Sequence, residues 1–382
     1  MKCERLFYEI DSMEDEYLRI LEDVCNIESP TADKAGVDAV GEYFARMANK
    51  RAWRVEIDRQ EISGNVVTIT LNPDANEPPV VLSAHMDTVH PVGSFGTPAV
   101  KRDEKKMYGP GVMDCKGGAV AAFMAMVALE KCGFSRRPVT LILQSDEENG
   151  SASSGKATVR YMCERSKGAV AFLNLEGMSG NSAVVSRKGI LRYRFDIRGI
   201  ALHSARCPEA ASAIAEAAHK ILRLEELKDP VGLTCNCGII SGGTVANTVP
   251  EHCSFIADIR YSTEDERKKV ETLVCELASK SFIKGCECEL KLISSRPAMP
   301  RISRNEELLK TMNEIYEQNG LPILKPRDCL SGSDAAYISE AGIPCIDCIG
   351  TEGSNIHSLD EFIYLCSLCE SAKRIASVIY LI

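Results

Sequence analysis

A histidine and an aspartate, His85 and Asp87, stand two residues apart directly after an apolar run from Pro79 to Ala84. The run is typical of a buried strand, and open α/β sheets bind ligands at the carboxyl ends of their strands. Asp87 is well placed to accept the imidazole N–H of His85, which fixes the tautomer and leaves the other ring nitrogen for a metal ion. A capped turn at the end of the strand explains this pair equally well, so the choice between a metal site and a turn depends on other segments of the chain.

Two further apolar runs end in acidic side chains. Residues 138–144 are followed closely by Glu147 and Glu148, and residues 169–175 by Glu176. Carboxylates that directly follow buried strands are costly unless they bind a partner. The alternative for Glu147 and Glu148 is a solvated loop, with acids favourably placed before the next helix. Together with His85, these strand ends indicate side chains that converge at one edge of a sheet.

Two more candidates lie in glycine-rich loops. Asp114 belongs to the segment G-P-G-V-M-D-C-K-G-G, ahead of an apolar helix expected at about 119–132. His357 belongs to G-T-E-G-S-N-I-H-S, after a strand expected at 344–348. The glycines allow close approach of the backbone. Taken singly, a helix-capping Asp114 and an exposed loop His357 are sufficient interpretations.

Considered together, these side chains form a mixed nitrogen and oxygen ligand set: His85, Asp114, Glu148, Glu176 and His357. Such a set suits zinc or a similar divalent ion better than calcium. Five ligands around one central carboxylate fit two metal ions about 3.5–4 Å apart, which would activate a shared water and polarise a carbonyl. Glu147, next to ligand Glu148, is the candidate base that takes the proton of the water and delivers it to a leaving amine.

The bulk composition is that of a globular protein with two or three domains. The chain has 382 residues, of which 45% are hydrophobic and 26% charged. A net charge of −9 gives no reason to expect nucleic acid or an anionic membrane as a partner. We find no apolar run near the roughly 18 residues of a membrane span, and no signal peptide. The 17 scattered cysteines are therefore expected to be reduced thiols in the cytoplasm.

The hydrophobic pattern divides the chain into an α/β domain and an insertion. In the first part we expect helices at 12–27, 35–50 and 153–165, and strands at 53–58, 64–71 and 79–84. The insertion is expected to contain strands at 189–198, 231–240, 252–261 and 286–294 and helices at 208–226 and 264–283. The α/β pattern then resumes with helices at 305–319, 334–341 and 361–380.

The order within the insertion, β-α-β-β-α-β, is that of the ferredoxin-like split unit. We therefore predict a catalytic α/β/α domain with a central, mostly parallel sheet, formed by residues 1–184 and 297–382. Residues 185–296 are predicted to form the inserted domain.

The joint motif set closely resembles a family of dinuclear zinc hydrolases. Its motifs here are S-A-H-M-D-T-V, G-P-G-V-M-D-C-K-G-G, D-E-E-N-G-S, L-E-G and the late G-x-x-x-H. The family includes glutamate carboxypeptidases, aminoacylase, acetylornithine deacetylase, succinyl-diaminopimelate desuccinylase and tripeptidase, and the resemblance covers essentially the whole chain. It implies that His85 and Glu176 hold one ion, that Glu148 and His357 hold the other, and that Asp114 bridges them.

The resemblance also implies that Asp87 orients His85 and that Glu147 is the general base. Zinc is the expected metal, although cobalt and manganese suit such a site as well.

For the insertion, the resemblance implies a homodimer. His203 matches a family histidine that reaches the active site of the neighbouring subunit and helps to hold an oxyanion. Asn247 would contact the scissile group, Arg260 a substrate carboxylate, and Gly332 lies in a loop that lines the substrate pocket. From the sequence alone, His203 is as well explained as a turn residue and Arg260 as a surface charge.

The resulting prediction is a metal-dependent hydrolase that cleaves an amide or peptide bond next to a free carboxylate, as an exopeptidase of carboxypeptidase type. The main alternative is an N-acyl amino acid deacylase. A non-catalytic binding protein or a scaffold dimer on the same fold are further alternatives. Cys115, beside Asp114, is interpreted as a packing residue or as a thiol whose oxidation would disturb the bridging ligand.

Overall fold

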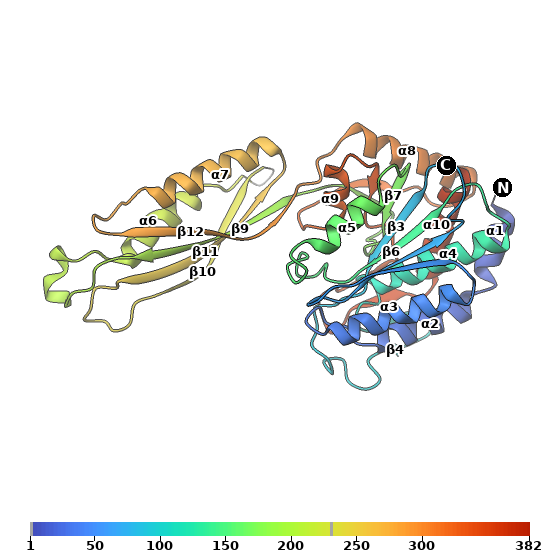
Figure 1. Cartoon of the computed structure of the whole chain (residues 1–382), viewed down its shortest axis with the longest axis horizontal. Coiled ribbons are helices and arrows are strands. Elements are labelled where there is room, and N and C mark those ends of the chain that lie inside the picture. The colour runs from blue at the N-terminus through green and yellow to red at the C-terminus, as the bar shows by residue number, and fades with distance from the viewer. Residues whose placement is uncertain (1–2, 230–231) are drawn as a thin grey trace. The chain divides into compact units, whose positions relative to one another are not determined.

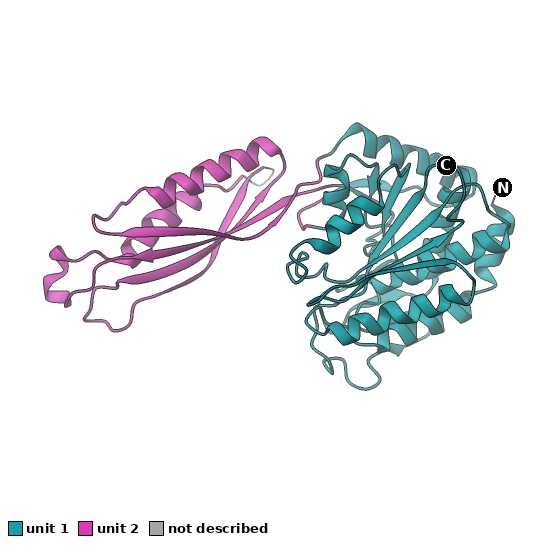
Figure 2. Cartoon of the chain, in the orientation of Figure 1, with its two compact units in different colours: residues 1–185, 301–328, 333–382 teal, residues 186–300, 329–332 magenta. Residues whose placement is uncertain are grey.

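The computed structural model describes residues 3–229 and 232–382, so the first residue of the strand predicted at 231–240 lies outside the described part. The chain divides into two compact units (Figure 2). Unit 1 comprises Met1–Val185, Arg301–Asp328 and Ser333–Ile382, and unit 2 comprises Ser186–Pro300 and Cys329–Gly332. The sequence pattern places these boundaries at 184/185 and 296/297, and it gives no sign of the second segment of unit 2.

A six-stranded sheet forms the centre of unit 1, in the order β1-β2-β6-β3-β7-β14 (Figure 1). Its strands are Arg54–Asp58 (β1), Val66–Leu71 (β2), Val80–His85 (β3), Val139–Gln144 (β6), Ala171–Asn174 (β7) and Cys345–Ile346 (β14). Strands β1, β2 and β6 pair antiparallel, whereas β6, β3, β7 and β14 run parallel. The prediction of a central, mostly parallel sheet is therefore confirmed, and the antiparallel strands at one edge make the sheet mixed.

Helices cover both faces of this sheet. They are Glu4–Asp11 (α1), Glu14–Asn26 (α2), Lys34–Asn49 (α3), Lys116–Lys131 (α4), Ala157–Arg165 (α5), Ser303–Gln318 (α8), Ala335–Glu340 (α9) and Cys366–Leu381 (α10). Strands β2, β3, β6 and β7 are buried along their whole length, which explains their continuous apolar sequence. In the described part of the chain, none of the helices is long and apolar enough to cross a membrane.

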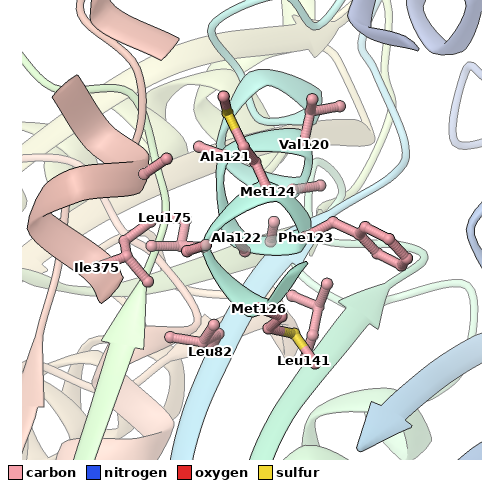
Figure 3. Close-up of a cluster of buried hydrophobic side chains, with 14 of the residues drawn as sticks. Leu82, Val120, Ala121, Ala122, Phe123, Met124, Met126, Leu141, Leu175 and Ile375 are labelled. Atoms are coloured by element: carbon pink, nitrogen blue, oxygen red, sulfur yellow. The ribbon is translucent and has the colours of Figure 1, made fainter. Parts of the chain in front are cut away.

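Helix α4 is the centre of the unit 1 core (Figure 3). Every residue from Lys116 to Leu129 is buried, because α4 packs on β3 and β6 on one side and on α10 on the other. Phe123 contacts the ring of Trp53, with 5.1 Å between the ring centroids. A helix that is apolar on all sides is expected only where it is enclosed by other elements. This packing fixes the first turn of α4, directly after Asp114.

Several short strands lie outside the central sheet. Lys101–Arg102 (β4), Lys106–Tyr108 (β5), Gly353–Ser354 (β15) and Phe362–Tyr364 (β16) form a small sheet, and Ser182–Arg187 (β8) pairs with Lys325–Cys329 (β13). The helix predicted at 361–380 is therefore wrong at its start. Residues 362–364 pair with β5, and the helix begins at Cys366.

Unit 2 contains a four-stranded antiparallel sheet. Its elements, in chain order, are Gly189–Arg198 (β9), the short 3₁₀ helix Ser204–Glu209 (η1), Ala213–Leu224 (α6), Thr234–Gly242 (β10), His252–Tyr261 (β11), Glu264–Ser279 (α7) and Glu287–Arg296 (β12). The sheet order is β10-β11-β9-β12, as expected for the ferredoxin-like split unit. Unit 2 has its own core, in which Phe195 and Phe255 stack with 4.6 Å between their centroids.

The close packing at the start of α4 yields a test. A Cβ atom at Gly118 would lie 2.1 Å from the carbonyl oxygen of Leu175, so Gly118→Ala must displace backbone at the end of β7. We expect a loss of about 3 kcal/mol in the free energy of unfolding, measured by urea denaturation. Gly133→Ala, just after the other end of α4, meets open space at φ +74° and should cost about 1 kcal/mol. Equal losses in the two variants would contradict this account of the packing.

Candidate active site

The parallel strands bring the predicted site residues of unit 1 to one edge of the central sheet. His85 is the last residue of β3, Glu147 and Glu148 follow β6, and Glu176 follows β7. Because β6, β3 and β7 are neighbours with the same direction, their carboxyl ends lie side by side (Figure 1). Asp114 enters from the loop before α4 and His357 from the loop between β15 and β16.

The carboxylate of Asp114 lies between two histidines. Its Oδ1 atom is 3.2 Å from Nε2 of His85, and its Oδ2 atom is 3.0 Å from Nε2 of His357. Nε2 of His85 is also 3.7 Å from Oε2 of Glu176, and Nε2 of His357 is 3.1 Å from Oε2 of Glu148. The five side chains thus form two groups that share Asp114, each with one histidine and one glutamate of its own.

These separations fit bound metal ions. Two atoms that each lie about 2.0–2.1 Å from a tetrahedral zinc ion are roughly 3.3 Å apart, close to the distances between the candidate ligand atoms. Ligand atoms of His85, Asp114 and Glu148 all lie within 4.8 Å of one another, as do those of His85, Cys115 and Glu176. The donor set and its spacing therefore suit one or more divalent ions.

The electrostatics also favour a cation. The side chains of Asp114 and Glu148 are 9% and 7% exposed. Burial raises the pKa of Glu148 to about 7 and that of Glu176 well above its ordinary value. Hydrogen bonds with Asp114 and Glu148 raise the pKa of His357 to about 10. The poorly solvated surroundings of Glu148 and Glu176 thus oppose ionisation of these two carboxyl groups unless positive charge is supplied, as a metal ion would do.

Asp87 contacts both His85 and the loop that carries Glu147 and Glu148. Nδ1 of His85 is 2.9 Å from the main-chain oxygen of Asp87 and 3.4 Å from its Oδ1 atom, which directs Nε2 toward Asp114. The fully buried Asp87 carboxylate also accepts the backbone N–H groups of Glu147 and Glu148, both at 3.1 Å, and the hydroxyl of Thr31 at 2.7 Å. The sequence predicts the contact with His85 but not the contacts that fix the acidic loop.

Comparison with known proteins now identifies the family. The family model described as peptidase family M20/M25/M40 matches residues 81–381. The chain belongs to this M20 family. It is a hydrolase that acts on amide or peptide bonds.

Individual proteins that are similar to this chain are consistent with this family assignment. Carboxypeptidase G2 of Pseudomonas sp. (strain RS-16) is 26% identical over 349 residues, which cover 89% of this chain and 83% of the relative. Succinyl-diaminopimelate desuccinylase of Wolinella succinogenes is 26% identical over 314 residues, 77% of this chain and 81% of the relative. Among solved structures, an aminopeptidase of Bacillus cereus matches with a TM-score of 0.80 at 20% identity, covering 96% of this chain and 98% of that one.

Glu361 is a residue of this M20 chain that the sequence analysis missed. Its side chain is 2% exposed, and its Oε1 atom accepts the backbone N–H groups of Met113 and Asp114 at 2.9 and 3.0 Å. Burial raises its pKa to about 8. Glu361 thereby holds the backbone on which the Asp114 carboxylate is mounted. The sequence offers only a weak sign of this role, which is that Glu361 lies four residues after the candidate ligand His357.

Cys115 lies beside the candidate metal ligands. It is fully buried, and its thiol donates to the carbonyl oxygen of Leu175 at 3.1 Å. Its Sγ atom is within 4.8 Å of ligand atoms of His85 and Glu176. Burial raises the pKa of the Cys115 thiol, so the neutral form is favoured.

The remaining predicted site residues of the M20 chain belong to unit 2. His203 caps the 3₁₀ helix η1, where its Nδ1 atom accepts the backbone N–H of Ala205 at 3.2 Å. The main-chain oxygen of Asn247 accepts the N–H of Ser204 at 2.9 Å, so His203 and Asn247 are close together.

Arg260 and Gly332 lie elsewhere in unit 2. The Arg260 guanidinium donates to both carboxylate oxygens of Asp258, at 2.7 and 3.3 Å. Gly332 accepts from Arg187 through its main-chain oxygen. A Cβ atom at Gly332 would lie 2.7 Å from Cδ of Arg296, so the turn there is closely packed.

The contacts of Asp87 yield a second test. Asp87→Asn replaces one accepting oxygen by an N–H₂ group, which cannot accept the N–H of Glu147 or Glu148. We expect zinc or manganese affinity to fall about 10- to 100-fold, measured by competition with a chelator. Asp103→Asn is a matched control, because the exposed Asp103 also accepts two backbone N–H groups, from Lys105 and Lys106. Equal affinities for the two variants would show that Asp87 does not support the site.

Proposed function

We propose that this M20 hydrolase cleaves an amide or peptide bond next to a free carboxylate, as an exopeptidase with two divalent metal ions, with zinc as the expected metal. The observation that carries the proposal is the Asp114 carboxylate, whose two oxygens face two different histidines at 3.2 and 3.0 Å. His85 and Glu176 would hold one ion, Glu148 and His357 the other. Bound ions would supply an activated water and polarise the scissile carbonyl.

In this proposal Glu147 is the general base. It takes a proton from the attacking water and returns it to the leaving amine, as a carboxylate in hydrogen-bond reach of both can do. Its place supports this role, because its backbone is anchored on Asp87 and its side chain, 9% exposed, belongs to the same acidic loop as Glu148. Asp87 acts as a positioning residue for both His85 and Glu147.

Unit 2 would supply substrate contacts. Since Nδ1 of His203 accepts a backbone N–H, the ring proton of the neutral imidazole lies on Nε2. That nitrogen is then a donor suited to an oxyanion, and the family resemblance assigns it to the active site of a partner subunit. Arg260 is proposed to bind the substrate carboxylate, as the family resemblance implies and as the planar guanidinium favours. Asn247 is proposed to contact the scissile group and Gly332 to line the pocket.

A deacylase is the second candidate. The relative named succinyl-diaminopimelate desuccinylase favours it, while the relative named carboxypeptidase G2 favours a peptidase. Both reactions break a C–N bond next to a carbonyl and need the same residues. We also propose a homodimer formed through unit 2 and a cytoplasmic location, the latter because 17 scattered cysteines in a chain of this length are typical of reduced thiols.

Replacement of the proposed base tests the mechanism. The Glu147→Ala protein should bind zinc or manganese as the parent does, while turnover falls by about 10²- to 10⁴-fold. Substrates should be a panel of N-acyl amino acids and a panel of di- and tripeptides, with released amine measured after loading with metal. Glu61→Ala, at an exposed acid of unit 1, serves as the control.

The two panels also separate the candidate functions. Turnover of peptides alone supports the exopeptidase, and turnover of acyl amino acids alone supports the deacylase. Full activity of Glu147→Ala would refute the proposed base. A metal-loaded protein that is inactive on both panels would indicate a narrower substrate than either panel contains.

The role of His203 is tested by mixing subunits. If it acts on the partner's site, the inactive proteins Glu147→Ala and His203→Ala should form hybrid dimers that contain one intact site. Up to about a quarter of the parent activity should return if subunits exchange at random and each hybrid has one working site. Exchange should be verified by mass spectrometry of the intact dimers. Exchange without recovery would contradict action in the partner.

A further inference from the structure

A cleft of about 600 Å³ in unit 1 is lined in part by Glu148, one of the candidate metal ligands. Its walls come from three segments: residues 30–33 just before α3, the loop after β3, and the loop after β6. A volume of this size is typical of sites that accept small molecules. The cleft therefore adjoins the candidate metal centre and is large enough to hold part of a substrate.

Two of these walls are fixed to each other by the backbone. The N–H of Thr88 donates to the oxygen of Ser29 at 2.9 Å, and the N–H of Thr31 donates to the oxygen of Thr88 at 3.1 Å. Farther along the same loop, the N–H of Gly93 donates to both carboxylate oxygens of Glu28, at 3.0 and 2.9 Å. The cleft is thus formed before any ligand arrives, which lowers the entropy cost of binding.

Apolar side chains make up much of the lining. They are Pro30, Ala32, Val89, Pro91 and Val92. Val89 and Val92 are 41% and 61% exposed, although valine is usually buried. Apolar side chains grouped beside a catalytic centre indicate that a ligand with an apolar surface covers them.

The charge of the cleft restricts the ligand further. Its acidic lining residues are Asp33 and Glu148, and no lysine, arginine or histidine is among the described residues that line it. An anionic group in the cleft would face Asp33, and none of the described lining residues carries a positive charge. A dicarboxylic acyl chain, such as succinyl, is therefore disfavoured relative to a neutral chain of similar length.

The position of the cleft indicates which half of the substrate it accepts. Glu148 lines it, whereas Glu147, the proposed proton donor to the leaving amine, is not among the described lining residues. The amine half of the substrate is expected beside Glu147, and the acyl half is therefore expected in the cleft.

We propose that this cleft is a specificity site for a neutral, apolar acyl group or side chain on the acyl side of the scissile bond. The inference rests on the proposed function and adds a substrate class to it. Val89 and Val92 are the residues that would contact the apolar chain, and Asp33 is the residue that would exclude an anionic one.

Kinetics test the proposal directly. Acetyl, hexanoyl and succinyl derivatives of one amino acid, the best substrate of the acyl panel, should be compared on the metal-loaded enzyme. We expect hexanoyl to exceed acetyl at least tenfold in kcat/KM, since each buried methylene adds to binding. Val92→Ser should reduce this ratio several-fold, mainly through a higher KM for the hexanoyl substrate. Ile62→Ser, at an apolar residue of unit 1 that is 73% exposed outside the cleft, is the control and should keep the parent ratio.

A binding measurement gives an answer that does not need turnover. Acetohydroxamate, hexanohydroxamate and the monohydroxamate of succinic acid should be titrated calorimetrically into metal-loaded Glu147→Ala protein. Hexanohydroxamate should bind most tightly, and Asp33→Asn should improve the succinyl compound several-fold relative to the hexanoyl one. Equal binding of acetyl and hexanoyl compounds, or tightest binding of the succinyl one, overturns the proposed specificity and leaves the proposed hydrolase intact. Failure of the protein to take up metal refutes the proposed function itself, and the inference with it.

Discussion

The Asp114 carboxylate, shared between two histidines, is the interaction on which the rest of the site depends. Each of its oxygens faces a different imidazole. The orientation of this carboxylate therefore decides whether both sets of candidate ligands are complete or only one. A carboxylate can serve two ions in this way only if its backbone is held firmly, because a small rotation would favour one side. Much of the surrounding structure acts to prevent such a rotation.

That support comes from elements far apart in the sequence. Glu361 accepts the N–H of Asp114 itself, and the closely packed glycines at the start of α4 hold the following turn against β7. Asp87 supports the other side, because a single buried carboxylate fixes both the His85 ring and the loop of Glu147 and Glu148. The candidate ligands and the residues that orient them therefore form one connected hydrogen-bond network, as is usual around metal sites.

The sequence predicts the parts of this arrangement that rest on strong local patterns. Continuous apolar strands that end in polar residues predicted the parallel strands and the edge at which His85 and Glu176 meet. The alternating strands of unit 2 predicted its β-α-β-β-α-β order. Glu361 and the second role of Asp87 were missed, because each acts on backbone N–H groups of a distant segment, and such contacts leave no periodicity. Strand β16 was assigned to a helix because its three residues are too few to show alternation.

The insertion has a consequence for the order in which the protein is made. His85, Asp114, Glu148 and Glu176 all precede unit 2 in the chain, whereas His357 and Glu361 follow it. During synthesis the acidic residues therefore leave the ribosome well before the last histidine, and before β14 and α10 complete the sheet and core of unit 1. Unit 2 has its own core and can fold while unit 1 is still open. Formation of the complete candidate metal site therefore requires residues from both sides of unit 2 in the chain, and a chain truncated before residue 357 would lack both His357 and Glu361.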